Sequence, residues 1–385
     1  MGIHENVCNV QSRVSCFSLN TTIDGGISVQ QPVLRIPSGY PRQIQRRDRI
    51  GVVLFHWGGP SRVKEVHSFL RRVYDDKYVR KHSRAFRNFQ AVFSWLAAAS
   101  MREKVQHELS AVGGNCPAIK LVNEQVRGLE RKLARRWGNR IDVNFRVYAA
   151  MQYAHPFAHE TAHQMRQDGI KHVILIPAYL QESNAGRQKS VGNWHKLVDN
   201  QKIPQWPTHE IPPFGRAPKV LTALSERIDQ TLQRFPKSLR SSVAVIFCAP
   251  GIPGQDKAKF QAEVLRVSQE VMQQRTEKRS AYTAFYAYYG HIGDHLRELK
   301  KKIVKAADVG NRCVMLLPLC GTTENLQTTY SMDIACRDYA SRAGIHHFEV
   351  AEMLNSNTLF LETLSDLIGE KVESSMKADV TTSPN

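Results

Sequence analysis

The sequence lacks any long uncharged apolar run, so it offers no transmembrane segment. The longest candidate, residues 91–101, is about half as long as the ~18 apolar residues that a membrane-spanning helix needs. Nothing near the N-terminus resembles the apolar stretch of a secretory signal. We therefore expect a protein that neither spans a membrane nor is secreted.

Cysteine is scarce, and the glycine patterns of nucleotide-binding loops are missing. The seven cysteines include no C-x-x-C pair, which excludes a disulfide scaffold and indicates reduced thiols. Neither G-x-x-x-x-G-K-[ST] nor G-x-G-x-x-G occurs, although a Gly58-Gly59-Pro60 turn follows an apolar run. A nucleotide site is therefore disfavoured.

Acidic residues are outnumbered, 35 against 53 basic ones, which gives a net charge of +18. Residues 51–150 alone carry 19 Lys and Arg against 8 Asp and Glu, a net charge of +11. Such a field favours nucleic acid, an anionic membrane surface or anionic ligands, and charge alone does not choose among them. Residues 1–49 hold six Arg against three acidic residues, a pattern that predicts a disordered extension or a mitochondrial presequence. Without a presequence we expect a cytoplasmic protein.

Short apolar runs alternate with helical spacing along the chain. Strands are expected at residues 50–56, 143–150 and 171–179, and again at 242–248, 281–288, 313–319 and 345–350. A polar, proline-rich passage at 181–218 carries no such pattern. Because strands that alternate with helices form parallel sheets covered on both faces, the fold class is α/β with two Rossmann-like domains. Ligands of such sheets bind beyond the carboxyl ends of the strands.

The predicted organisation has five parts. After the extension at 1–49, residues 50–236 form the first Rossmann-like domain and residues 237–352 the second. Residues 353–376 form an amphipathic C-terminal helix, and residues 377–385 a disordered tail.

Residues 159–163 match H-E-x-x-H, in which His159 and His163 would bind zinc and Glu160 would act as base. The helix that carries them is a short crossover whose apolar side is formed by other residues. We therefore expect both histidines on the solvent side and no zinc.

Residues 77–95 interleave five Lys and Arg with five aromatic residues. This stretch is either a solvated helix with an aromatic core face, a helix that binds an anionic membrane surface, or a lid over an aromatic anion. Nucleic acid is an unlikely partner because no recognition module is visible.

Several collinear segments resemble the ferrochelatase family, whose members insert iron into protoporphyrin to make haem. They lie at residues 53–76, 113–125, 148–156, 164–171, 178–183, 249–253, 318–333 and 354–367. The resemblance implies two Rossmann-like domains with the last helix returning to the first, and insertion of ferrous iron into protoporphyrin IX in the cleft between them. Iron and porphyrin are then substrates, and no cofactor is tightly bound. The family's C-terminal iron–sulfur cysteines are absent, because no Cys follows Cys336.

The same comparison places substitutions at the family's reactive positions. The family's histidine falls on Pro250, its glutamate on Gln327, and an arginine on Gln152. Metallation needs bases and transient metal ligands, which imidazole and carboxylate supply and proline and glutamine do not.

Three other histidines are candidate replacements for the missing groups. They are His56, at the end of the first strand, and His291 and His295 near the second domain's edge of the cleft. No confident set of metal ligands emerges.

The resemblance also predicts where a porphyrin lies. Its ring is expected against Trp57, Gln152, Tyr179 and Phe214, with its propionates attracted by the basic first domain. The alternative function is that of a catalytically inactive pseudoenzyme, which binds a tetrapyrrole or a metal without joining them.

Overall fold

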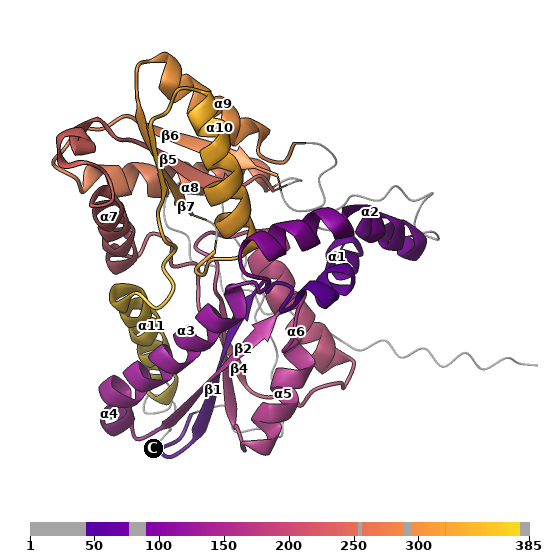
Figure 1. The fold of residues 1–385 in the computed structure, drawn as a ribbon. Coiled ribbons are helices and arrows are strands. Elements are labelled where there is room, and N and C mark those ends of the chain that lie inside the picture. The colour runs from indigo at the N-terminus through magenta and orange to yellow at the C-terminus, as the bar shows by residue number, and fades with distance from the viewer. Residues whose placement is uncertain (1–43, 77–89, 253–255, 288–293, 320, 378–385) are drawn as a thin grey trace, which may run out of the picture. The chain divides into compact units, whose positions relative to one another are not determined.

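Two four-stranded parallel β-sheets, one after the other along the chain, organise the computed structural model (Figure 1). The structure describes residues 44–76, 90–252, 256–287, 294–319 and 321–377. The strand orders are β2-β1-β3-β4 and β6-β5-β7-β8. The strands are β1 (Arg49–His56), β2 (Asn144–Met151), β3 (His172–Pro177), β4 (Thr208–Glu210), β5 (Ala244–Pro250), β6 (Ala281–Tyr286), β7 (Cys313–Pro318) and β8 (His347–Val350). The predicted α/β fold class is confirmed.

The central strands are buried on both faces. β1 pairs in parallel with β2 and β3, and β5 pairs in parallel with β6 and β7. All residues of β3, β5 and β7 are buried, as are all of β1 except its first. This burial explains why these strands read as continuous apolar runs, since a parallel sheet covered by helices leaves no polar face.

Helices connect the strands and cover the sheets. The α-helices are α1 (Val66–Tyr74), α2 (Gln90–Ala111), α3 (Ala118–Leu133), α4 (Asn139–Ile141), α5 (Ala158–Gln167), α6 (Lys189–Asp199), α7 (Pro218–Leu232), α8 (Lys257–Gln273), α9 (Arg297–Asp308), α10 (Cys336–Arg342) and α11 (Thr358–Lys377). Shorter 3₁₀ or π turns are η1 (Val63–Glu65), η3 (Ala134–Gly138), η4 (Asn184–Gln188), η5 (Lys237–Ser242) and η6 (Gln327–Ala335). Among the described residues, no helix is both long and apolar enough to cross a bilayer.

The passage at 181–218 contains structure that its sequence pattern does not predict. It holds α6 and β4, the edge strand of the first sheet. Trp194 of α6 is fully buried, and its ring lies edge-on to Phe55 of β1 at 6.1 Å between centroids. Val191 is buried beside it, and the partly buried Leu197 and Val198 complete the apolar side of this helix.

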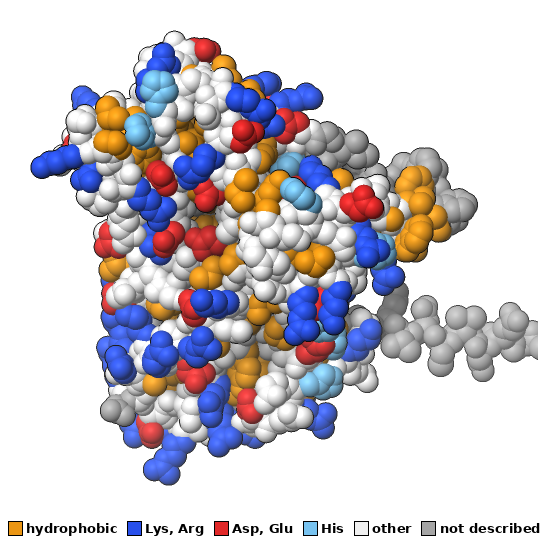
Figure 2. Space-filling view, in the orientation of Figure 1, with side chains coloured by type: hydrophobic (Ala, Val, Ile, Leu, Met, Phe, Trp, Pro, Cys, Tyr) orange, Lys and Arg blue, Asp and Glu red, His pale blue; other side chains and the backbone are white. Residues whose placement is uncertain are grey.

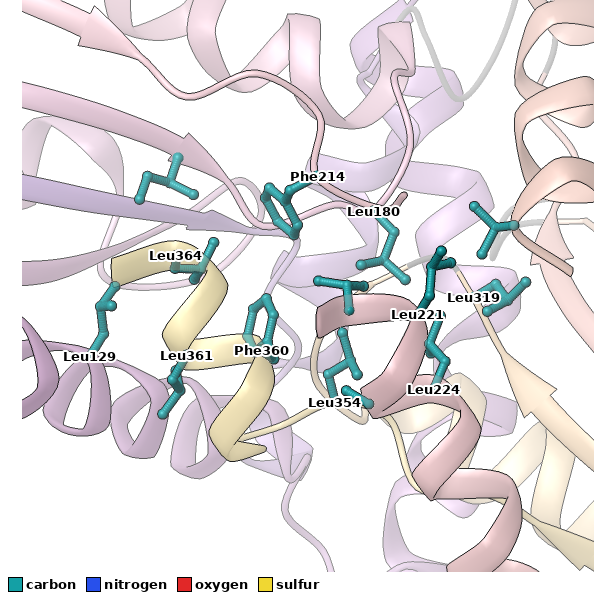
Figure 3. Close-up of a cluster of buried hydrophobic side chains, with 14 of the residues drawn as sticks. Leu129, Leu180, Phe214, Leu221, Leu224, Leu319, Leu354, Phe360, Leu361 and Leu364 are labelled. Carbon is teal, nitrogen blue, oxygen red and sulfur yellow. The ribbon is translucent and has the colours of Figure 1, made fainter. Parts of the chain in front are cut away.

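The last helix, α11, packs against α3 and α7, as the resemblance implied (Figures 1 and 3). It begins at Thr358, five residues later than predicted, because the Asn357 side chain accepts hydrogen bonds from the backbone N–H groups of Leu359 and Phe360. Figure 3 shows Phe360 next to Phe214, at 6.0 Å between ring centroids. The returning helix therefore completes the core of the first half.

One hydrophobic core includes residues of both sheets. Leu54 of β1, Ile176 of β3, Phe247 of β5 and Leu317 of β7 belong to the same buried cluster. Residues 39–385 accordingly form one unit by their contacts. The predicted domain boundary near residue 236 stays a prediction. The extension predicted at 1–49 is too long by its last residues, because Ile44 is buried in this core, while residues 1–43 and most of the tail lie outside the described residues.

Replacing Gly369 of α11 by Ala is expected to destabilise the protein, although Ala favours helices by up to about 1 kcal/mol over Gly. A Cβ at this position would overlap the indole ring of Trp137, which is buried and lies beneath the guanidinium of Arg140. Overpacking of this kind costs about 1–3 kcal/mol. Urea unfolding would measure the loss, and Gly192→Ala in α6, where a Cβ meets open space, is the matched control. Equal stability of the two variants would show that Trp137 can move aside.

Candidate functional site

A pocket lies at the carboxyl ends of the strands and is lined from both halves of the chain. The empty space between its lining residues is about 880 Å³ when the open solvent at its mouth is counted. The first half contributes His56, Trp57, Gly58, Gly59, Pro60, Phe69, Val105, Cys116, Ala118, Ala178 and Tyr179, and the second contributes Tyr286, Gly321, Thr322, Thr323, Asn325, Leu326, Gln327, Thr328 and Met353. No Asp, Glu, Lys or Arg is among these described lining residues. The site is therefore apolar, with a few hydroxyl, amide and imidazole groups.

The turn after β1 forms one wall and needs its glycines. Gly58 has a φ of +77°, and a Cβ there would lie 2.9 Å from the Cβ of Ala154. A Cβ on Gly59 would overlap the sulfur of Cys116. The two glycines thus let the backbone pass close to its neighbours and leave the space beyond open to a ligand.

His56 is the last residue of β1 and lines the pocket with only 5% of its surface exposed. Its carbonyl accepts a hydrogen bond of 2.8 Å from the N–H of Gln152, which fixes the backbone. Within the described part of the chain, its Nε2 has no hydrogen-bond partner. Burial lowers the pKa of His56 to about 3, so the ring is neutral at physiological pH.

Lowering the pH is expected to destabilise the folded protein, because His56 is buried in its neutral form. Because the folded-state pKa of His56 lies below the unfolded value of about 6.5, the unfolded chain binds more protons, and stability falls as pH drops from 6.5 towards 3. His56 should contribute a slope of about 1.4 kcal/mol per pH unit in that window. Denaturant unfolding of the wild type and of His56→Asn between pH 6.5 and 4.5 measures it. Parallel curves would show that His56 is not buried in solution.

Gln327 begins η6 and points its side-chain amide at the backbone. Its Nε2 donates to the carbonyl of Ala287 at 3.1 Å, and its own N–H donates to Oδ1 of Asn325 at 2.9 Å. Asn325 Oδ1 also accepts from the N–H of Thr328. At this position the side chain acts as a hydrogen-bond donor and cannot take up a proton.

Pro250 is buried at the end of β5 and is not among the lining residues. Its register partner in β6, Tyr286, lines the pocket. The next residue, Gly251, donates its N–H to the Tyr286 carbonyl at 2.6 Å. Of the two positions that the resemblance singled out, Gln327 thus lies in the pocket wall and Pro250 does not.

The expected porphyrin contacts divide into two groups. Trp57 and Tyr179 line the pocket, and the Trp57 ring lies edge-on to Tyr153 at 5.3 Å between centroids. Phe214 does not line it, because α11 covers Phe214 within the core, where it is only 3% exposed. Gln152 does not line it either, because its side chain turns towards Tyr153, whose hydroxyl lies 2.9 Å from Gln152 Nε2. The expectation for Phe214 and Gln152 is therefore corrected.

Of the other two candidate histidines, only His295 lies in the described part of the chain, and it does not join His56. His295 is half-buried outside the pocket, with Nε2 3.2 Å from the hydroxyl of Ser331. His291 lies outside the described residues. Of the three candidates, the structure places only His56 at the site.

The H-E-x-x-H motif has a structural role on α5. His159 and His163 are both exposed, as predicted. Glu160 accepts a hydrogen bond of 2.7 Å from the backbone N–H of Phe157 and pairs with His155, 2.8 Å from its Nδ1. The glutamate thus caps the start of the helix. That this pair binds no zinc stays a prediction.

Sequence reasoning missed several lining residues, among them Cys116, the threonines at 322, 323 and 328, and Met353. Burial raises the pKa of the Cys116 thiol, so it stays protonated. Gln125 of α3, fully buried, positions the threonine-rich loop, because its Nε2 donates to the carbonyls of Thr322 and Asn355 at 3.1 and 2.8 Å. The run of small polar residues after β7 was the available signal, since it follows a strand end.

Comparisons with known proteins show similarity to ferrochelatases over most of the chain. A sequence model described as Ferrochelatase matches residues 49–372. A ferrochelatase from Gloeobacter violaceus is 27% identical over 332 residues, which cover 84% of this chain and 98% of that protein. A ferrochelatase from Synechocystis sp. is 25% identical over 336 residues, covering 83% and 82%.

Among solved structures, two chelatases are similar at lower levels. SirB from Bacillus subtilis with Fe3+ has a TM-score of 0.47 and 11% identity, covering 87% of this chain and 98% of that one. CbiX, described as the terminal enzyme for biosynthesis of siroheme in denitrifying bacteria, has a TM-score of 0.43 and 12% identity, covering 85% and 98%.

Proposed function

Because the chain belongs to the ferrochelatase family, we propose that it binds protoporphyrin IX in the pocket at the strand ends and inserts ferrous iron into it slowly. Family membership supports a tetrapyrrole and metal-chelation function. The observation that carries the proposal is the pocket itself, which is apolar, lies where ligands of parallel sheets bind, and has aromatic side chains on its walls. Trp57 and Tyr179 offer flat apolar surface to a flat ring.

The low rate follows from the side chains at the site. Metallation requires the metal to lose water and two pyrrole N–H protons to leave. A base for these protons is absent at Pro250 and Gln327, and the buried His56 resists protonation because its pKa is about 3. A protein of this fold that holds the tetrapyrrole without metallating it is the alternative function.

Binding can be tested apart from chemistry. Titration of protoporphyrin IX with the full chain should shift the Soret band, and Trp57→Ala should weaken binding at least about tenfold by removing a lining aromatic surface. Trp95→Ala is the matched control, because Trp95 is 51% exposed on α2 and is not a lining residue. A wild-type protein that produces no Soret shift at tens of micromolar would contradict the proposal.

A membrane-surface partner is favoured by one further observation. Val92, Phe93, Trp95 and Leu96 of α2 are 39–56% exposed, and Figure 2 shows hydrophobic side chains gathered over this helix. Most of the basic aromatic stretch at 77–95 precedes α2 and lies outside the described residues. We propose that α2 binds anionic membrane surfaces. Cosedimentation with phosphatidylglycerol vesicles, lost in Trp95→Glu, would support this.

The location of the protein in the cell can be tested separately. The relatives named above are bacterial, and they give no support to the mitochondrial location predicted from the basic N-terminal extension. Imaging of a C-terminally tagged chain, with and without residues 1–43, would test that prediction.

A further inference from the structure

We propose that His56 binds the iron of a metallated porphyrin as an axial ligand, so that the pocket retains haem or a similar iron tetrapyrrole. This inference rests on the proposed function, because it places the porphyrin in the same pocket. It adds a second role, the holding of a finished metalloporphyrin, and assigns it to a residue outside the two substituted family positions.

The first support is an unsatisfied nitrogen. The side chain of His56 is 5% exposed and lines the pocket, and its Nε2 has no hydrogen-bond partner within the described residues. Buried polar atoms in native proteins nearly always have partners, so an orphaned one at a pocket wall indicates a missing ligand. A neutral imidazole nitrogen binds either a hydrogen-bond donor or a metal.

The second support is charge. No Asp, Glu, Lys or Arg stands among the described lining residues, so a free metal cation would enter an apolar site without counter-charge. An iron porphyrin core is neutral with ferrous iron and carries one positive charge with ferric iron, as in hemin, because two deprotonated pyrrole nitrogens balance two charges of the iron. The same burial that lowers the pKa of His56 opposes a proton on the ring and leaves its lone pair available. The pocket thus suits an iron tetrapyrrole better than hydrated iron.

The third support is the rigid position of His56 at the end of a central strand. His56 ends a strand that pairs on both sides, and its carbonyl is held by the N–H of Gln152. A ligand on a rigid central strand keeps its position when the metal binds. Of the sulfur groups in the lining, the buried Cys116 remains a protonated thiol, the form that does not bind iron.

The test compares two tetrapyrroles on the full chain. Hemin and metal-free protoporphyrin IX are titrated into the wild type, His56→Ala and His159→Ala, an exposed histidine that serves as control. We expect a histidine-ligated haem spectrum and at least tenfold weaker hemin affinity in His56→Ala. Protoporphyrin affinity should stay within twofold in His159→Ala and should fall clearly less than hemin affinity in His56→Ala. Added imidazole should restore the histidine-type spectrum to His56→Ala.

The outcomes separate this inference from the proposed function. If protoporphyrin binds and the hemin spectrum is unchanged in His56→Ala, the axial role is wrong and the proposed function stands. If a folded His56→Ala protein loses affinity for hemin and for protoporphyrin IX equally, the axial role is also wrong. That result would show that His56 packs against the ring and does not bind the iron. If neither tetrapyrrole binds to the wild type, both proposals fail. Should His56→Ala unfold, His56→Asn takes its place under the same criteria.

Discussion

The unmodified protein is expected to insert iron into protoporphyrin IX about 10²–10⁴-fold more slowly than the cyanobacterial ferrochelatases it resembles. That range is the usual cost of removing one positioned acid–base group, and the resemblance predicts that Pro250 and Gln327 stand in place of two such groups. Pro250 is buried outside the pocket lining, and the amide of Gln327 donates to the Ala287 carbonyl. Neither side chain can accept a pyrrole proton at neutral pH.

The measurement is an anaerobic assay with Fe²⁺, repeated with Zn²⁺, beside the Synechocystis enzyme under identical conditions. Porphyrin affinity is measured in parallel, so that slow turnover is not confused with absent binding. Turnover equal to that of the cyanobacterial enzyme would exclude the pseudoenzyme alternative. It would direct attention to His56, with His291 and His295, as replacement groups.

The second large effect is expected on restoring the missing side chains. Pro250→His combined with Gln327→Glu should raise metallation at least about tenfold, and by more than the product of the single changes, because residues that act as a unit are not additive. Proline donates no backbone hydrogen bond, so Pro250→His breaks none in β5. In Gln327→Glu, burial and the facing Ala287 carbonyl should raise the pKa of the new carboxyl and let it carry a proton near neutral pH.

Pro250→Gln combined with Gln327→Glu is the matched control. It frees the backbone in the same way but adds no imidazole. Thermal unfolding and protoporphyrin titration establish that each variant is folded and binds its ligand. A double variant that passes both checks and gains no activity would show that these two positions do not limit the reaction, and would favour the alternative of a binding protein.

Much of the fold could be predicted because strands that are buried on both faces have continuous apolar sequences. The strands β1, β3, β5 and β7 are buried almost throughout and read as unbroken apolar runs. By contrast β4 spans only three residues at a sheet edge, too few to set a period. α6 does carry Val191, Trp194 and Val198 at helical spacing, but the polar and proline-rich residues around this short segment obscured the pattern.

The site could be predicted where it depends on strand ends and not where it depends on distant packing. His56 and Trp57 follow from the rule that ligands meet the carboxyl ends of parallel strands. Phe214 lies in the first half, but a helix that starts more than a hundred residues later covers it. No local pattern carries that information, because an aromatic residue in a loop reads the same whether it faces a ligand or the core.

The late position of α11 also sets the order in which this protein can be completed on the ribosome. The first sheet and its helices end near Phe235, and the helix that packs on α3 and α7 begins about 120 residues later. At roughly 5–20 residues per second, the nascent first half waits about 6–24 s with the apolar side of α3, including Leu129, lacking its final cover. Until α11 is made this side of α3 lacks that cover, and a chain that stops before Thr358 never gains it.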